Sequence, residues 1–192
     1  ELVREAAAEA LMEVGAPGDA AAVALLADRA AEEESPKVRR AILLALSKVA
    51  ARGDATAMAV AYTCLGDSVV DVRWAAARAV APLAEAGDAE AVRRLGACFA
   101  DEQWIVRHAA AEALADVAAR EDPEVKALLS GQLQGEEDYQ VKKAIQQTLA
   151  KLAGQEPPSQ VPVWNGGLFA VFAHNYGAQT QYQGSSQPDD WD

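Results

Sequence analysis

A valine followed by a basic residue recurs along the chain at a nearly constant spacing, and this feature constrains the fold most. Five such pairs form a regular series, at Val3-Arg4, Val38-Arg39, Val72-Arg73, Val106-Arg107 and Val141-Lys142. Successive valines are 35, 34, 34 and 35 residues apart. A period of this length is typical of repeat proteins, in which each repeat is one supersecondary unit that stacks on its neighbours to bury its apolar face.

The residues that follow each valine predict an amphipathic α-helix. With the valine as position 0, apolar residues recur at positions 3, 4, 7, 8 and 11, which places one apolar stripe along a helix. Position 3 is always alanine, namely Ala6, Ala41, Ala75, Ala109 and Ala144. We call these five helices second helices, because each is expected to close one unit.

Turn residues separate the units. Gly-Asp pairs follow the first three second helices, at Gly18-Asp19, Gly53-Asp54 and Gly87-Asp88, and Asp122-Pro123 follows the fourth. Glycine can end a helix in the left-handed conformation, and aspartate or proline can begin the next one. About 18 residues then precede the next valine, enough for a first helix and a short turn. The predicted fold class is all-α, a right-handed α-solenoid of helical hairpins with an extended C-terminal tail.

The predicted organisation has two parts. Residues 1–153 hold one orphan second helix, opened by Val3, and about four helical hairpins, and residues 154–192 form the tail. A second helix cannot bury its apolar stripe alone, and the one opened by Val3 has no first helix. We therefore expect either that this chain is cut from a longer array or that a partner covers the apolar edge of this helix.

These residues resemble HEAT repeats, especially the short HEAT-like repeats of the phycobilisome-lyase type, over residues 1 to about 153. The resemblance implies a structural ladder in which an acidic residue before each second helix pairs with the arginine of that helix or of its neighbour. A spacing of six recurs between an acid and the basic residue after it, with Asp67 and Arg73, Asp101 and Arg107, and Glu136 and Lys142 as the expected members.

Charge and composition narrow the function. A net charge of −12 argues against nucleic acid and anionic membranes as partners, and no apolar run reaches the 18 or so residues of a membrane span. We expect protein partners within a multi-subunit complex, with peripheral association with a membrane complex left open. The two cysteines, Cys64 and Cys98, do not form a disulfide framework, so we expect an intracellular, reducing compartment such as the cytoplasm or an organelle stroma.

Positions 2 and 6 of the second helices point away from the apolar stripe and vary between units, which predicts a binding ridge. Trp74 with Arg78 is a candidate anchor, although the indole could also pack on the adjacent ridge. His108 and Glu112 could share a metal, but a surface pair between the two side chains is favoured, and we expect no metal, cofactor or catalytic residue. The expected ridge residues are Arg40, Trp74, Arg78, His108, Glu112 and Lys143.

The tail differs in composition, since residues 155–192 contain four acids and no Lys or Arg. It is rich in aromatics, which linkers usually lack, so docking on a partner is preferred over packing on the solenoid or a plain linker. The expected contact residues are Trp164, Leu168, Phe169, Phe172, Tyr176, Tyr182 and Trp191.

The sequence therefore predicts a non-enzymatic protein-binding scaffold or accessory subunit of a larger assembly. Two other hypotheses stay open. The resemblance alone suggests a chromophore (bilin) lyase-like component, and an assembly chaperone would use the same surfaces.

Overall fold

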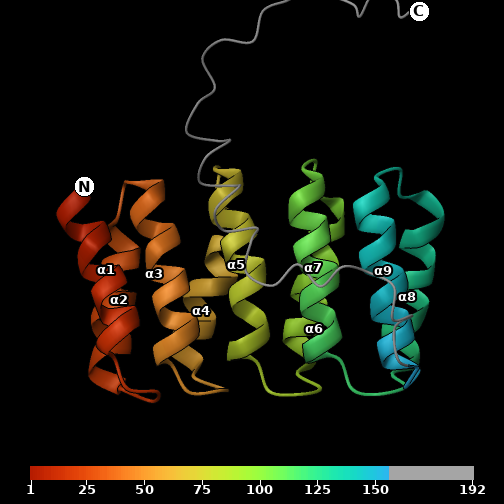
Figure 1. Cartoon of the computed structure of the whole chain (residues 1–192), viewed down its shortest axis with the longest axis horizontal. Coiled ribbons are helices and arrows are strands. Elements are labelled where there is room, and N and C mark those ends of the chain that lie inside the picture. Colours follow the sequence, from red (N-terminus) through yellow and green to blue (C-terminus); the bar gives the residue numbers. More distant parts are fainter. Residues whose placement is uncertain (156–192) are drawn as a thin grey trace, which may run out of the picture. The chain divides into compact units, whose positions relative to one another are not determined.

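A computed structural model of the chain describes residues 1–155, and every regular element in this range is helical (Figure 1). The elements are α1 (Leu2–Val14), α2 (Ala20–Glu32), α3 (Pro36–Val49), α4 (Ala55–Cys64), α5 (Val70–Leu83), α6 (Ala89–Ala97), the short 3-10 helix η1 (Cys98–Ala100), α7 (Trp104–Val117), α8 (Pro123–Gly135) and α9 (Tyr139–Leu152). The predicted α-solenoid is confirmed.

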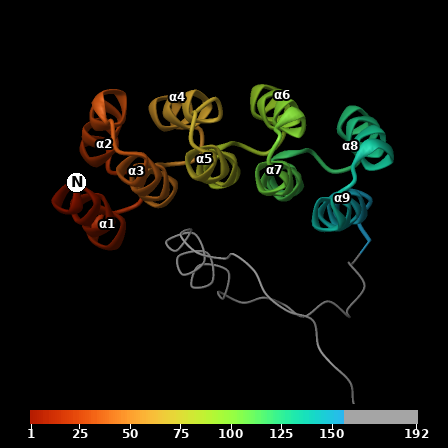
Figure 2. The ribbon, with the colours of Figure 1, turned by 90° about the horizontal axis from the view of Figure 1, so that it is seen from above.

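The helices form two layers. The second helices α1, α3, α5, α7 and α9 pack in succession, each on the next, and the first helices α2, α4, α6 and α8 form the other layer (Figure 2). Each first helix packs on the second helix of its own hairpin. The row of second helices lies on the inner side of a gentle arc, so their outward-facing residues make up the inner ridge of the solenoid.

The apolar stripe of the second helices forms the core. Val38 is 1% exposed, and its counterparts Val72, Val106 and Val141 are fully buried. Leu46 and Leu114 at position 8 are also fully buried. Each such side chain contributes about 1.5–3 kcal/mol on leaving water, and the stripe is filled only when neighbouring units stack. The residues that recur with the sequence period are thus the residues that form the core of each unit.

The loop glycines act differently from the prediction. α3 ends at Val49, and Gly53 follows it by four residues, so the glycine turns the loop and does not end the helix. Its φ of +77° is left-handed, and its N–H donates to the carbonyl oxygen of Leu83 at the end of the next second helix, at 2.7 Å. Gly18 and Gly87 donate in the same way to Val49 and Val117. Each loop is therefore tied to the following unit.

The predicted aspartate caps are confirmed. The Asp54 carboxylate accepts from the Ala57 N–H at 2.9 Å, and those of Asp19, Asp88 and Asp122 accept from N–H groups in the first turns of α2, α6 and α8. These bonds satisfy N–H groups that have no partner within a helix. None of the described helices is both long enough and apolar enough to cross a membrane.

Candidate functional site

In the second helices α1, α3, α5 and α7, one arginine binds the acidic residue of the next unit. The Nε and Nη2 atoms of Arg73 donate to the two carboxylate oxygens of Asp101 at 2.7 and 3.0 Å. Arg39 binds Asp67 with the same two distances, and Arg107 binds Glu136 at 2.8 Å through both nitrogens. Bidentate geometry of this kind is the strongest form of arginine–carboxylate pairing. The ladder therefore runs between units, from each second helix to its neighbour.

The spacing of six has a different origin. Nη1 of Arg73 donates to the main-chain oxygens of Asp67 and Ser68 at 2.9 and 3.2 Å, so the arginine binds the backbone, not the carboxylate, of the acid six residues before it. Arg107 binds the oxygens of Asp101 and Glu102 in the same way. One guanidinium thus fixes the turn of its own unit and the acid of the next.

The two ends of the ladder differ from its middle. Arg4 of α1 binds the buried Glu33, which Arg29 also contacts. The expected side-chain pair between Glu136 and Lys142 does not form, because Arg107 occupies Glu136. Among residues 1–155 no carboxylate reaches Lys142.

Electrostatics show how tightly the ladder is paired. Hydrogen bonds from Arg4 to Glu33 and from Arg107 to Glu136 are the main causes that lower the pKa of each carboxyl from 4.5 to about 2. Burial alone would raise the pKa of Asp101, but hydrogen bonds from Arg73 and the Gln103 N–H lower it overall. Removing one partner would leave a poorly hydrated charge, so these arginines serve the fold.

The inner ridge places a guanidinium on a covered indole. Trp74 is only 8% exposed, and the Arg78 guanidinium carbon lies 5.1 Å from its ring centroid. Trp74 therefore does not stand open on the ridge as an anchor would, because it packs into the second-helix layer, and the exposed part of the pair is Arg78. The contact is a cation–π interaction that holds the arginine in place.

His108 and Glu112 form the expected contact one turn apart, with Nδ1 and Oε2 separated by 3.5 Å. The His108 ring also meets Trp104 edge-on, with ring centroids 6.3 Å apart. Within the described residues no three His, Cys, Asp or Glu side chains gather where they could hold a metal ion.

Three cations of the ridge have no carboxylate partner among the described residues. They are Arg40 and Lys48 on α3 and Lys143 on α9. Neither α3 nor α9 contains an acidic residue, so nothing on the same helix can neutralise them. Arg78 on α5 adds a fourth, bound to a ring and not to a carboxylate. Leu44, half-buried, lies between Arg40 and Lys48 on α3.

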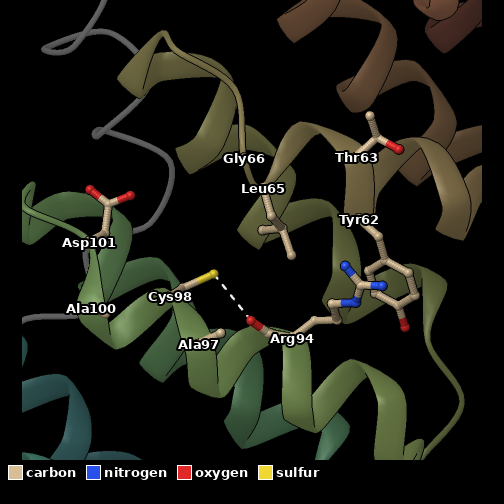
Figure 3. Close-up of a pocket in the computed structure, with 9 residues that line it drawn as sticks. All are labelled: Tyr62, Thr63, Leu65, Gly66, Arg94, Ala97, Cys98, Ala100 and Asp101. Atoms are coloured by element: carbon tan, nitrogen blue, oxygen red, sulfur yellow. Dashed lines mark hydrogen bonds between the residues drawn. The ribbon is translucent and has the colours of Figure 1, made fainter.

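The sequence did not predict an open cleft of about 530 Å³ on the first-helix side (Figure 3). It lies between the end of α4 and the α6–η1 segment. Arg94 stacks over Tyr62 at 5.2 Å, and the Tyr62 hydroxyl is buried without a hydrogen-bond partner in the described chain. Burial raises the pKa of Tyr62 to about 12 and that of Cys98 to about 11, so both are protonated at neutral pH. Cys98 is therefore present as the thiol and not as the more nucleophilic thiolate.

The sequence-predicted contact residues of the tail, Trp164 to Trp191, lie outside the residues that the structure describes.

Two layers of stacked hairpins, tied by an arginine at each junction, define the class of protein as an α-solenoid. A family model described as HEAT repeats matches residues 58–150, from α4 into α9, and this part of the chain belongs to that family. The closer resemblance to repeats of the phycobilisome-lyase type stays a prediction. No curated protein matches the chain.

Proposed function

We propose that the solenoid is a non-enzymatic scaffold or accessory subunit that binds an acid-rich segment of a partner protein along its inner ridge. HEAT repeats in general provide surfaces for protein–protein interaction. The specific proposal concerns the ridge of α3 and α5, where Arg40, Lys48 and Arg78 lie.

The division of labour among the arginines carries the proposal. Arg39 and Arg73 bind the carboxylates of the ladder, whereas Arg40 and Arg78, at ridge positions of the same two helices, have no carboxylate partner in residues 1–155. Cations without partners keep their full attraction for an incoming anion. Because charges are screened beyond about 8–10 Å, a segment bound along α3 and α5 feels mainly these cations and the carboxylates of the adjacent α1, and less the acidic character of the remaining solenoid.

The chemistry of the surface fits an extended or helical segment with acidic and apolar residues. Leu44 provides an apolar contact between the two cations of α3, one helical turn from each. Arg78 is held by Trp74, so little side-chain entropy is lost when it binds a carboxylate. Arginine is one of the residues enriched at interface hot spots.

A labelled peptide tests the proposal. We would measure fluorescence anisotropy of a fluorescein-labelled peptide that alternates Glu and Leu, with a Lys and Leu peptide as the probe of opposite charge. The double variant Arg40→Glu/Arg78→Glu should weaken binding of the acidic peptide at least about tenfold, since each reversed contact is worth on the order of 1 kcal/mol.

The matched control is Arg93→Glu/Arg120→Glu, which makes the same charge change away from the ridge. It should change the affinity less than about twofold. Equal losses in the two variants would mean that only net charge matters, and preference for the Lys and Leu peptide would contradict the proposal.

The tail and the compartment remain proposals that rest on composition. The aromatic residues 164–191 would add a second contact with the same partner. A reducing, intracellular location is compatible with Cys64 and Cys98, which are both buried and free.

A further inference from the structure

Two exposed aromatic side chains lie at the beginning of neighbouring second helices. Within α3 to α9 of the described chain, the exposed large hydrophobic side chains are Trp104, at 39%, and Tyr139, at 71%. They are the first residues of α7 and α9. Because α5 and α9 pack on either side of α7, the exposure of Trp104 belongs to the stacked repeat itself. Apolar surface that recurs in adjacent units forms a patch, and such patches mark interaction sites.

The register of the repeat places both aromatics on the inner ridge. Trp104 stands two residues before Val106, and Tyr139 two residues before Val141, so both occupy position −2. On a helix, position −2 lies one turn before position 2 and on the same face. The perpendicular contact between Trp104 and His108, which is at position 2, agrees with this placement. The aromatics therefore extend the ridge toward the N-terminal ends of α7 and α9, which lie at the same end of the solenoid (Figure 1).

The ridge is thus divided between two chemistries. Its half on α3 and α5 carries the cations of the proposed site, and the residues at position −2 there, Pro36 and Val70, are only partly exposed. Its half on α7 and α9 carries the two rings, and at positions 2 and 6 of these helices the cation is Lys143. A segment that crosses the row of second helices meets charge on one half and aromatic surface on the other.

The spacing of the helices sets the spacing of the two contacts. Second helices pack in succession, and packed helices lie about 8–10 Å apart, so Trp104 on α7 is about 20 Å from Arg40 on α3. An extended chain rises about 3.3 Å per residue, so about six residues span this distance. An acidic residue on Arg40 and an apolar residue on Trp104 would therefore be about six residues apart in one segment.

We propose that the segment bound by the ridge is bipartite, with acidic residues on α3 and α5 and an apolar residue that packs on Trp104, beside Tyr139. This inference rests on the proposed function and adds to it the composition and spacing of the segment. The occupant is an extended segment of a separate protein. Its apolar residue covers the indole and phenol rings, which present large, rigid apolar surfaces with a polar edge.

Fluorescence anisotropy with the full chain tests the proposal. The probe is a fluorescein-labelled peptide with a Glu block and a Leu block whose centres are about six residues apart. Trp104→Ala should weaken its binding at least about fivefold, because Trp is enriched at interface hot spots. A peptide in which Gly and Ser replace the Leu block should lose less than about twofold, because it does not reach the indole.

Two variants control for the fold. Trp104→Phe keeps an aromatic ring and should hold the affinity for the probe within about threefold of the unaltered chain. Leu25→Ala removes an exposed apolar side chain of α2, in the layer of first helices, and should change the affinity less than about twofold. Equal losses of the two peptides in Trp104→Ala would show that the indole does not recognise the Leu block, and this overturns the proposal.

The remaining outcomes separate this proposal from the one on which it rests. Weaker binding in Arg40→Glu/Arg78→Glu, with no effect of Trp104→Ala, overturns the bipartite segment and leaves the acid-binding ridge intact. No effect of Arg40→Glu/Arg78→Glu overturns both. A rise in affinity of more than about threefold in Asp189→Asn/Asp190→Asn would identify residues 156–192 of this chain as the occupant, and the partner segment would be wrong.

Discussion

The substitution Arg73→Met tests the ladder at the junction between α5 and α7. It removes the bidentate pair with Asp101 and the bonds to the main-chain oxygens of Asp67 and Ser68. The Asp101 side chain is 11% exposed, so it would keep its charge with little hydration. Breaking a largely buried pair by removing one partner costs about 3–5 kcal/mol. Because these side chains retain some exposure, we expect about 3 kcal/mol.

Urea unfolding followed by circular dichroism measures this loss, and the midpoint should fall while the m-value stays constant if the units still unfold together. The matched control is Arg40→Met, which removes an arginine from a second helix where it has no carboxylate partner, and it should change stability by less than about 0.5 kcal/mol. A loss below about 1 kcal/mol for Arg73→Met, or similar losses for both variants, would show that the ladder does not stabilise the stack.

Three further predictions follow from local geometry. Glu121, with φ of +61°, occupies the left-handed position that glycine takes in the other loops. Glu121→Gly should therefore raise the free energy of unfolding by about 1 kcal/mol in the same urea assay. A decrease in the free energy of unfolding would contradict this. The folded-state pKa of Glu33 and of Glu136 is lowered from 4.5 to about 2, so the unfolded state binds protons first as pH falls. The two carboxylates should contribute fully to stability above about pH 5, and this contribution should be lost progressively as pH falls toward 2. An acid titration of Tm that stays flat between pH 5 and 3 would argue against it. The pKa of Cys98, raised to about 11 by burial, predicts that the folded chain reacts slowly with iodoacetamide at pH 8 and that urea accelerates alkylation at least about tenfold, whereas equal rates would place the thiol in water.

The core could be predicted from the sequence because its physics is periodic. Val38, Val72 and Val106 stand at one register of a helix and face the same neighbours in every unit, so one pattern describes them all. The aspartate caps were also predictable, since Asp54 needs only the N–H groups of the residues that follow it. Such local rules do not depend on how the units stack.

The ladder partners could not be decided in this way. In a repeat, Asp67 stands six residues before Arg73 and 28 after Arg39, and only the stacking of units shows that its carboxylate binds Arg39. The burial of Trp74 could not be predicted for the same reason. Whether a side chain at position 2 is covered depends on the neighbouring helices and not on the sequence of its own helix. The cleft beside Tyr62 and Arg94 joins first helices of two units and leaves no motif in either.

We propose that the inner ridge of α3 and α5 binds acid-rich protein segments. The most direct measurement is an NMR titration of the ¹⁵N-labelled chain with the unlabelled Glu and Leu peptide. We expect the largest chemical-shift changes on α3 and α5 around Arg40, Leu44 and Arg78, and we expect them to disappear in Arg40→Glu/Arg78→Glu. Shifts centred on the cleft around Tyr62 and Arg94, or no saturable shifts at all, would contradict it.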